Sequence, residues 1–278
     1  LWSHGSFSLR RTYPDGMGPI TRTEERTDSG LRVSYPAIAW DQPEQAAGVT
    51  ADLRELANDG GEIQWWIEAP PEVVERVAAK AGWVRLRTLV QLRRPLPMEA
   101  PPPIPGLRTF DPDRDVDAWL ELNNQAFSWH PEQGHQNHAG MAATLTAAWV
   151  DLDGFFVVDA AQFEAATIQD GTRPPNTTHA LAGFCWTKFH PATSATDASG
   201  ADVALGEVYV IATAPSARGR GLGQALVQAG MDHQYRVRGA EQAMLWTESD
   251  NTGALKLYER LGYTVHHTNV AYGPGAGS

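Results

Sequence analysis

The spacing of apolar residues from residue 107 onward predicts an alternation of helices and strands. Apolar positions three or four residues apart indicate helices, and short apolar runs between turn residues indicate strands. The predicted order is helices at 116–127 and 141–150, strands at 154–158, 179–188 and 205–213, a helix at 221–238, a strand at 243–248, a helix at 252–261 and a strand at 263–271. Gly262 is placed to cap the last helix. This order predicts a mixed α/β sheet rather than a helical bundle or a β-sandwich.

The first part of the chain gives a shorter pattern of strand 63–67, helix 71–82 and strand 84–92. A proline-rich stretch follows at 95–106, and proline disfavours both helices and central strands, so this stretch is expected to be an extended linker. We therefore divide the chain into a lobe at 1–97, a linker at 98–106 and a second lobe at 107–278. Polar stretches at 169–178 and 193–203 are expected to be surface loops.

Composition narrows the possible functions. The 278 residues are 42% hydrophobic and carry a formal net charge of −11, without a long basic run, which argues against binding nucleic acid. No apolar stretch approaches the roughly 20 residues needed to cross a bilayer, so no membrane partner is expected. Cys185 is the single cysteine and forms no internal disulfide, which suits a reducing cytoplasm. We expect a cytoplasmic monomer.

The strongest chemical signal is the run Arg218-Gly219-Arg220-Gly221-Leu222-Gly223, between a predicted strand and a predicted helix. Glycine lets backbone N–H groups approach a ligand, and a helix start favours an anion. The two arginines add positive charge. The run therefore predicts a phosphate or pyrophosphate site, and the alternative is a glycine-rich turn that caps a helix. Its glycine spacing matches neither the dinucleotide-binding fingerprint nor the P-loop.

This run resembles the Arg/Gln-x-x-Gly-x-Gly/Ala signature of the Gcn5-related N-acetyltransferase (GNAT) superfamily. The order of strand, loop, helix, strand, helix and strand is also similar, with Asn and Tyr in the segment 248–263. Further motifs resemble the tandem-lobe mycothiol synthase family within that superfamily; they lie at 123–127, 130–134, 183–191 and 205–210. The resemblance implies an α/β (α+β) GNAT fold with a complete C-terminal lobe.

The same resemblance describes the lobe at 1–97 less well. Its strand, helix and strand at 63–92 look like the end of a GNAT lobe, but no Arg/Gln-x-x-Gly-x-Gly precedes them. We therefore expect a truncated or degenerate GNAT-like lobe that binds no CoA and serves as a packing partner for the catalytic lobe.

The resemblance implies direct acetyl transfer from acetyl-CoA to the cysteinyl amine of cysteinyl-glucosaminyl-inositol, a small-molecule substrate. A free α-amine has a pKa of about 7.7–8.0, so a modest base is sufficient to neutralise it. By resemblance Glu207 is that general base, and Tyr258 is the general acid that protonates the departing thiolate. The alternatives are an ordinary paired carboxylate for Glu207 and a core aromatic for Tyr258.

The resemblance also assigns the cofactor site to the end of strand 205–213, the glycine-rich run and the start of helix 252–261. Its residues are Ile211, Ala212, Thr213, Arg218, Gly219, Arg220, Gly221, Leu222, Gly223, Gln224, Asn251, Thr252, Gly253, Ala254, Leu255 and Lys256. A backbone N–H near 211–213 is the expected donor to the oxyanion. Asn251 is alternatively, or additionally, a helix N-cap.

Candidates for acceptor binding are Glu132, Lys188, Glu207, Trp186 and Trp246. Glu132 and Lys188 are otherwise solvated charges, and Trp186 is otherwise a core residue. Trp246 stands where the family has tyrosine, and indole lacks the acceptor oxygen of a phenol, which bears on acceptor choice.

Two further residue types are interpreted without a catalytic role. Cys185 is expected to be a buried structural thiol. No metal is expected, because the histidines follow no metal-binding pattern with Cys or Glu; they include His130, His135, His138, His266 and His267. Two other functions stay open, namely a GNAT enzyme that acts on another amine and a non-catalytic acyl-CoA-binding module.

Overall fold

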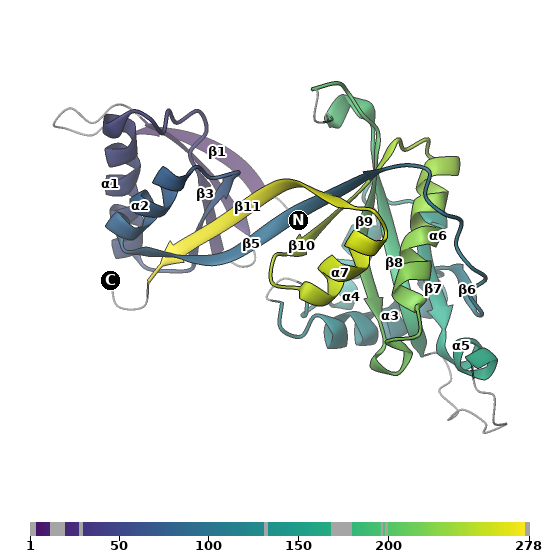
Figure 1. The fold of residues 1–278 in the computed structure, drawn as a ribbon. Helices are drawn as coiled ribbons and strands as arrows, with labels where there is room; N and C mark the ends of the chain where they lie inside the picture. Colours follow the sequence, from purple (N-terminus) through teal and green to yellow (C-terminus); the bar gives the residue numbers. More distant parts are fainter. Residues whose placement is uncertain are drawn as a thin grey trace. The chain divides into compact units, whose positions relative to one another are not determined.

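The computed structural model describes residues 4–11, 20–27, 30–130, 133–167, 180–195, 197 and 200–275. The chain divides into two compact units (Figure 1). Unit 1 consists of Leu1–Gln91, Thr247–Leu255 and Val265–Ser278, and unit 2 of Leu92–Trp246 and Lys256–Thr264. Of the stretches predicted to be loops, 169–178 lies outside the described residues.

Unit 1 is a sheet with two helices. Its elements are β1 (His4–Arg11), β2 (Ile20–Thr27), β3 (Gly30–Ser34), α1 (Pro43–Asp59), β4 (Ile63–Glu68), α2 (Glu72–Ala81), β5 (Trp83–Pro95) and β11 (Thr264–Pro274). The strand order is β1-β2-β3-β4-β11-β5. The last strand, β11, is inserted antiparallel to β4, with Ala271 opposite Trp66. Unit 1 is therefore completed by residues near the C-terminal end of the chain.

Period-two alternation along β4 determines which side chains form the core of unit 1. Trp65 is fully buried among Leu53, Trp83 and Tyr272, whereas Trp66 lies on the other face, half-buried under the guanidinium groups of two arginines. Successive strand residues point to opposite faces, so two adjacent tryptophans occupy different environments.

A buried ion-pair network joins α1 to the sheet of unit 1. Arg22 of β2 donates from Nη1 to Oδ2 of Asp52 at 2.8 Å and also pairs with Glu24. The Tyr35 hydroxyl donates to the same Asp52 oxygen at 2.7 Å. Asp52 is fully buried, and these donors supply the charge and hydrogen bonds that a buried carboxylate requires.

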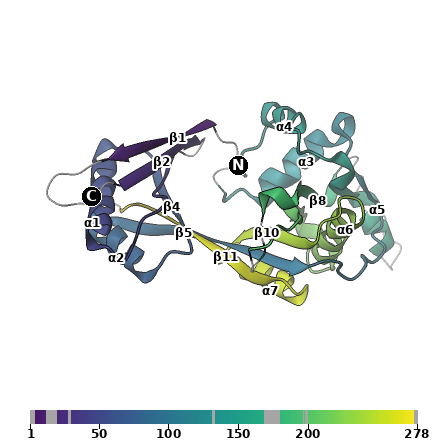
Figure 2. The same cartoon turned by 90° about the horizontal axis from the view of Figure 1, so that it is seen from above.

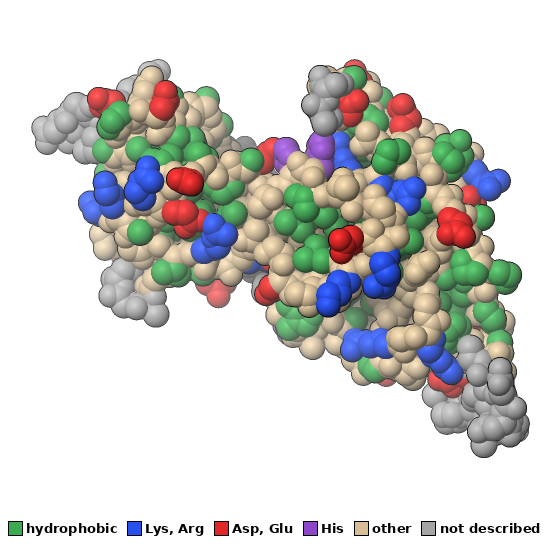
Figure 3. Space-filling model, in the orientation of Figure 1, with side chains coloured by type: hydrophobic (Ala, Val, Ile, Leu, Met, Phe, Trp, Pro, Cys, Tyr) green, Lys and Arg blue, Asp and Glu red, His purple; other side chains and the backbone are tan. Residues whose placement is uncertain are grey.

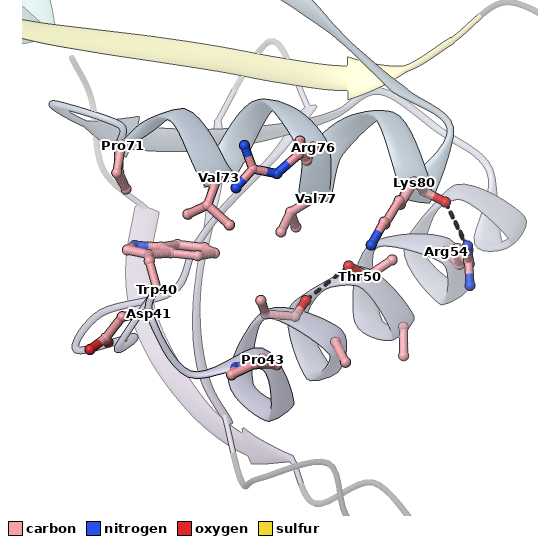
Figure 4. A pocket seen from close by; sticks show the side chains of 13 residues that line it. Trp40, Asp41, Pro43, Thr50, Arg54, Pro71, Val73, Arg76, Val77 and Lys80 are labelled. Carbon is pink, nitrogen blue, oxygen red and sulfur yellow. Dashed lines mark hydrogen bonds between the residues drawn. The ribbon is translucent and has the colours of Figure 1, made fainter.

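A groove of about 800 Å³ lies between α1 and α2 (Figure 4). Trp40 lies at one end and Lys80 at the other, and small side chains of α1 such as Ala47 help to line it. Arg54 is held at this groove by a 2.6 Å hydrogen bond from Nη2 to the Lys80 carbonyl oxygen. The groove belongs to unit 1, whereas the glycine-rich run belongs to unit 2.

Unit 2 is a sheet with the strand order β5-β10-β9-β8-β7-β6. Its strands are β6 (Leu107–Thr109), β7 (Phe155–Asp159), β8 (Leu181–His190), β9 (Leu205–Thr213) and β10 (Gln242–Glu248). Its helices are α3 (Pro112–Ala126), α4 (His138–Leu145), α5 (Ala160–Thr167), α6 (Leu222–Arg236) and α7 (Thr252–Arg260), the last shared with unit 1.

Helices α3 and α6 lie on opposite faces of this sheet (Figure 2). Alternation along β8 explains the arrangement. Trp186 packs against Trp119 of α3, while Cys185 lies against α6, where a Cβ added to Gly230 would come within 3.0 Å of its sulfur atom. Both faces of β8 are therefore buried, which agrees with the continuous apolar run of its sequence.

The predicted mixed α/β sheet is confirmed, together with each helix and strand predicted after residue 107, with ends that shift by a few residues. The sequence analysis did not predict β1, β2, β3 and α1 in unit 1, or β6 and α5 in unit 2. The boundaries at 97 and 106 both fall within the stretch Leu92–Trp246 of unit 2. The division into lobes at 1–97 and 107–278 stays a prediction.

The two adjacent tryptophans of β4 test the core of unit 1. Trp65→Ala is expected to lower the free energy of unfolding by about 3–5 kcal/mol, because it removes a fully buried ring and leaves a cavity. Trp66→Ala is the matched control and is expected to cost clearly less. Urea unfolding followed by circular dichroism measures both, and equal losses would contradict the described burial.

Candidate functional site

Strand β9 separates from β10 halfway along its length. β9 and β10 pair in parallel from Leu205 opposite Gln242 to Val208 opposite Leu245. Beyond Val208, β9 continues to Thr213 paired with β8 on its other side. Among the described residues, the backbone of β9 from 209 to 213 therefore faces no ladder partner in β10.

A β-bulge lies at the point where the two strands separate. Trp186 of β8 pairs with Val210, and the next residue, Thr187, pairs with Val208, so Tyr209 is an extra residue in β9. Such bulges bend a strand and redirect its side chains, and they are frequent beside functional sites. Tyr209 lies two residues after Glu207 in β9, and the charge of Glu207 contributes to the raised pKa of the Tyr209 phenol.

The glycine-rich run forms an open turn at the start of α6. Gly219 and Gly221 have φ angles of 73° and 80°, a region that favours glycine, and a Cβ added to either would meet no atom within 4 Å. Gly221 is the N-cap of α6 and supplies no side-chain hydrogen bond to the helix. The first N–H groups of α6 therefore face an exposed turn, as expected for an anion site.

The start of α6 is held against β9 and α7. A Cβ added to Gly223 would lie 3.9 Å from Cγ2 of Thr213 and 3.7 Å from Cδ2 of Leu257. Thr213 lies six residues after Glu207, a span of about 20 Å along an extended strand. β9 thus connects the buried carboxylate near its start to the glycine-rich turn beyond its end.

Positive charge collects around this turn. In Figure 3, Lys and Arg side chains gather over α7 and the start of α6. Arg218, Arg220 and Lys256 are exposed there, and the Arg220 guanidinium carbon lies 5.5 Å from the centroid of the Phe163 ring. A chain with a net charge of −11 therefore presents a local cationic surface at the start of one helix.

Asn251 caps α7. Its Oδ1 accepts a hydrogen bond from the Ala254 N–H at 3.1 Å, which supports the N-cap interpretation made from the sequence. Residues 251–255 are counted with unit 1, and Lys256–Thr264 with unit 2. The cofactor contacts assigned to Asn251, Thr252, Gly253, Ala254, Leu255 and Lys256 stay predictions, as do those of Ile211, Ala212, Thr213 and the run from Arg218 to Gln224.

Glu207 is buried, with 9% of its surface exposed, and it has a partner that the sequence analysis did not identify. Its Oε2 lies 2.7 Å from Nε2 of His190 in β8. Lys188, which pairs directly with Glu207 across the strands, directs its ammonium group elsewhere. The His-Pro that ends the 183–191 motif was visible in the sequence, but the contact depends on the register between two strands 17 residues apart.

Lys188 lies against aromatic rings. Its Nζ is 4.9 Å from the ring centroid of Trp149 and 5.7 Å from that of Tyr209. Contacts of this kind hold an ammonium group by electrostatic attraction to the ring face. Burial, together with the charge of Glu207, raises the pKa of Tyr209 to about 12, so its phenol stays protonated at neutral pH. Lys188, Glu207, Tyr209 and His190 therefore form one polar cluster at the edge of an aromatic core.

Tyr258 lies deep in unit 2. Only 6% of its surface is exposed, and its ring packs edge-to-face against Tyr263 at 5.7 Å. Burial, with a contribution from nearby Cys185, raises its pKa above the ordinary value, so the hydroxyl keeps its proton. The predicted roles of Glu207 and Tyr258 as base and acid stay predictions, and the protonated phenol is in the state that an acid requires.

The remaining acceptor candidates have different surroundings. Trp186 is 2% exposed and stacks on Phe155 at 4.5 Å, which agrees with the core alternative for this residue. Trp246 is half-buried and packs against the cluster of Val203, Leu205 and Met244. Glu132 lies outside the described residues.

Metal ions find no ready site in the described parts of the chain, where no group of three or more His, Cys, Asp or Glu side chains could hold one. His138 pairs with Asp117, and His267 pairs with Glu68.

Among the described helices, none has the length and apolar character needed to cross a bilayer.

Comparisons with known proteins agree with this geometry. Residues 116–263 match the model of the acetyltransferase (GNAT) family. The chain belongs to this family and is an N-acetyltransferase, so the resemblance found in the sequence is confirmed. A mycothiol acetyltransferase of Thermobispora bispora is 40% identical to it over 225 residues, which are 79% of this chain and 68% of that protein. Seven other curated relatives with the same name are 36–39% identical.

Solved structures show that the fold extends over both units. A GCN5-related N-acetyltransferase from Sphaerobacter thermophilus matches with a TM-score of 0.65 at 20% identity, over 91% of this chain and 75% of that chain. A tandem GNAT protein from the clavulanic acid biosynthesis pathway matches with a TM-score of 0.55 at 12% identity, over 96% of this chain and 82% of that chain. The predicted GNAT fold is therefore confirmed, and the truncated or degenerate character of the N-terminal lobe stays a prediction.

Cys185 is expected to be unreactive in the folded protein. It is fully buried, and burial raises the pKa of its thiol to about 12, so at pH 8 almost none of it is thiolate, the nucleophilic form. Iodoacetamide at pH 8 is expected to leave the native protein unmodified and to alkylate it once in urea, as measured by intact mass. Because the chain has one cysteine, alkylation of the native protein would directly contradict its burial.

Proposed function

We propose that this enzyme acetylates the cysteinyl amine of cysteinyl-glucosaminyl-inositol with acetyl-CoA, which gives mycothiol. The curated relatives named mycothiol acetyltransferase support this acceptor, and the family supports acetyl-CoA as donor. One observation from the structure carries the proposal. A buried carboxylate, Glu207, stands on the same strand as the residues that lead into an open, cationic glycine turn.

The residues of the turn suit the diphosphate of CoA. The absence of side chains at Gly219 and Gly221 leaves the backbone of the turn open, and Arg218 and Arg220 supply positive charge beside it. In this proposal the N–H groups at the start of α6 bind the diphosphate, and the pantetheine arm follows β9 where it has left β10. The β9 backbone near 211–213 then provides the N–H donor for the oxyanion.

Glu207 and Tyr258 act at successive steps of the proposed reaction. Glu207 accepts a proton from the acceptor ammonium group, and the neutral amine attacks the thioester carbonyl, so that a carbon–nitrogen bond forms. The tetrahedral intermediate collapses and the carbon–sulfur bond breaks. The nitrogen gives its second proton to Glu207, which has by then released the first proton to solvent. Tyr258 gives its proton to the departing thiolate and is reprotonated from solvent. Its burial favours the neutral phenol that this role needs.

Lys188 is proposed to contact the acceptor. The rings of Trp149 and Tyr209 hold its ammonium group in place, and a fixed cation can donate strong hydrogen bonds to the hydroxyl groups of a polyol. Glu132 and Trp246 complete the proposed acceptor contacts. Because Trp246 replaces the family's tyrosine, the range of acceptors is the part of the proposal that most needs a direct assay.

The direct assay offers acetyl-CoA with a panel of amines and identifies the acetylated product by mass. Mass is the suitable readout because the acceptor has its own thiol, which also reacts with the reagents that detect CoA. The panel includes cysteinyl-glucosaminyl-inositol, glucosaminyl-inositol without the cysteine, and a peptide with a free amino terminus. Turnover of the first compound alone supports the proposed acceptor. Turnover only of another amine would replace it, and CoA binding without turnover would show a binding module.

Removal of the proposed base provides a second test. Glu207→Gln is expected to lower kcat by about 100- to 10,000-fold, the usual contribution of a general base. Glu259→Gln, an exposed carboxylate on α7, is the matched control and should retain full activity. Steady-state rates with saturating acetyl-CoA measure the effect, and a Glu207→Gln enzyme with normal kcat would refute this role.

Two glycines at opposite ends of α6 separate cofactor binding from backbone strain. Gly221 and Gly239 both have positive φ, 80° and 72°, and open space where a Cβ would lie. Alanine at either position is expected to cost about 1–2 kcal/mol of stability. Only Gly221→Ala is expected to weaken CoA binding in isothermal titration calorimetry, because only that turn faces the proposed diphosphate. Equal CoA affinity of the two variants would contradict this site.

A further inference from the structure

His190 and Glu207 form a pair that the proposed reaction does not yet use. Lys188 and His190 both lie on β8, and Glu207 pairs directly with Lys188, so His190 is its diagonal neighbour on the same face. The 2.7 Å contact joins Nε2 of His190 to Oε2 of Glu207. The carboxylate is mostly buried, and about one quarter of the His190 side chain is exposed.

The neighbours of Glu207 come from the three strands β8, β9 and β10. From β8, Lys188 and His190 face it, and the Lys188 ammonium group rests over two aromatic rings. From β9, Tyr209 approaches with a neutral phenol. From β10, the residue paired with it is the apolar Met244. Among these neighbours, His190 is the one that makes a hydrogen bond to the carboxylate in the described contacts.

The direction of this hydrogen bond follows from chemistry. An ionised carboxylate has no hydrogen to give, so Nε2 of His190 must carry the hydrogen and donate it to Oε2. One carboxylate oxygen is then occupied and the other, Oε1, is left to receive a proton. The bond also restricts rotation of the Glu207 side chain, and a base must be held within hydrogen-bond reach of the proton that it abstracts.

We propose that His190 is the positioning residue for Glu207, and that it fixes Oε2 so that Oε1 accepts the proton of the acceptor amine. This inference rests on the proposed role of Glu207 as base. A histidine suits the task because its Nε2–H can donate without a permanent positive charge, whereas a lysine in its place would repel the incoming ammonium group. Lys188 is kept at a distance from the carboxylate by its contacts with Trp149 and Tyr209.

Variants at position 190 distinguish positioning from proton transfer. His190→Ala is expected to lower kcat by up to about 100-fold, as misplacement of a catalytic group does, with an unchanged KM for acetyl-CoA. His190→Gln keeps an N–H donor at a similar reach and is expected to recover most of the activity. A glutamine variant as inactive as the alanine variant would overturn the proposal, because it would make His190 itself the base.

A double-mutant cycle tests whether His190 acts through Glu207. In a Glu207→Gln background, His190→Ala is expected to cause no further loss of kcat, because the base that it positions is already missing. Independent, multiplied losses would overturn the proposal. The assay uses whichever amine of the panel the wild-type enzyme acetylates, so a wrong acceptor assignment does not affect the result.

A readout independent of activity completes the test. In proton NMR spectra of the wild-type protein, the shared Nε2 proton is expected as a downfield signal that exchanges slowly with solvent. His190→Ala identifies the signal by its loss, and Glu207→Ala is expected to abolish it as well. A signal that survives Glu207→Ala, or the lack of any such signal, would overturn the pairing even if no amine in the panel reacted. CoA binding is also measured by calorimetry for each variant. An affinity equal to that of the wild-type protein shows that the variant is folded.

Discussion

The separation of β9 from β10 beyond Val208 is the constraint on which the site depends. A buried strand normally satisfies its N–H and C=O groups on both edges, and β9 does so on one edge only from 209 to 213. Polar backbone groups in such a position need a partner, and in the proposed reaction the pantetheine arm of acetyl-CoA supplies one. The bulge at Tyr209 lies at the start of the open segment, and the glycine turn before α6 lies beyond its end.

The charges near the open segment are held by different means. Glu207 is hydrogen-bonded to His190, Lys188 rests on the faces of two rings, and Arg220 lies over Phe163. Each of these groups is oriented by a neighbouring side chain. In the described contacts, Lys188 and Glu207 form no direct ion pair with each other. Lys188 and Glu207 are each oriented but are not paired with each other, so they remain available to a substrate, whereas a closed salt bridge between them would have to be broken first.

Much of unit 2 was predictable because its signals are local. The glycine-rich run is contiguous, and the helices and strands around it have clear apolar periodicity, so the element order and the class of enzyme followed from the sequence. The strands β1, β2 and β3 were missed because β2, for example, reads Ile-Thr-Arg-Thr-Glu-Glu-Arg-Thr and buries the charged pair Arg22 and Glu24 beside a single apolar residue, Ile20. The Glu207–His190 pair was missed because a bulge sets the register that creates it. The packing of Lys188 on Trp149 joins residues 39 positions apart, which no spacing rule reveals.

The insertion of β11 next to β4 has a consequence for how this protein is made. The two strands are separated by about two hundred residues, so unit 1 cannot close its sheet until nearly all of unit 2 has left the ribosome. Contacts of such long range form slowly, and the unpaired edge of β4 is exposed in the meantime. The first ninety residues are therefore synthesised early but complete their sheet only after β11 is made. Chaperones that shield strand edges can act on these residues throughout that interval.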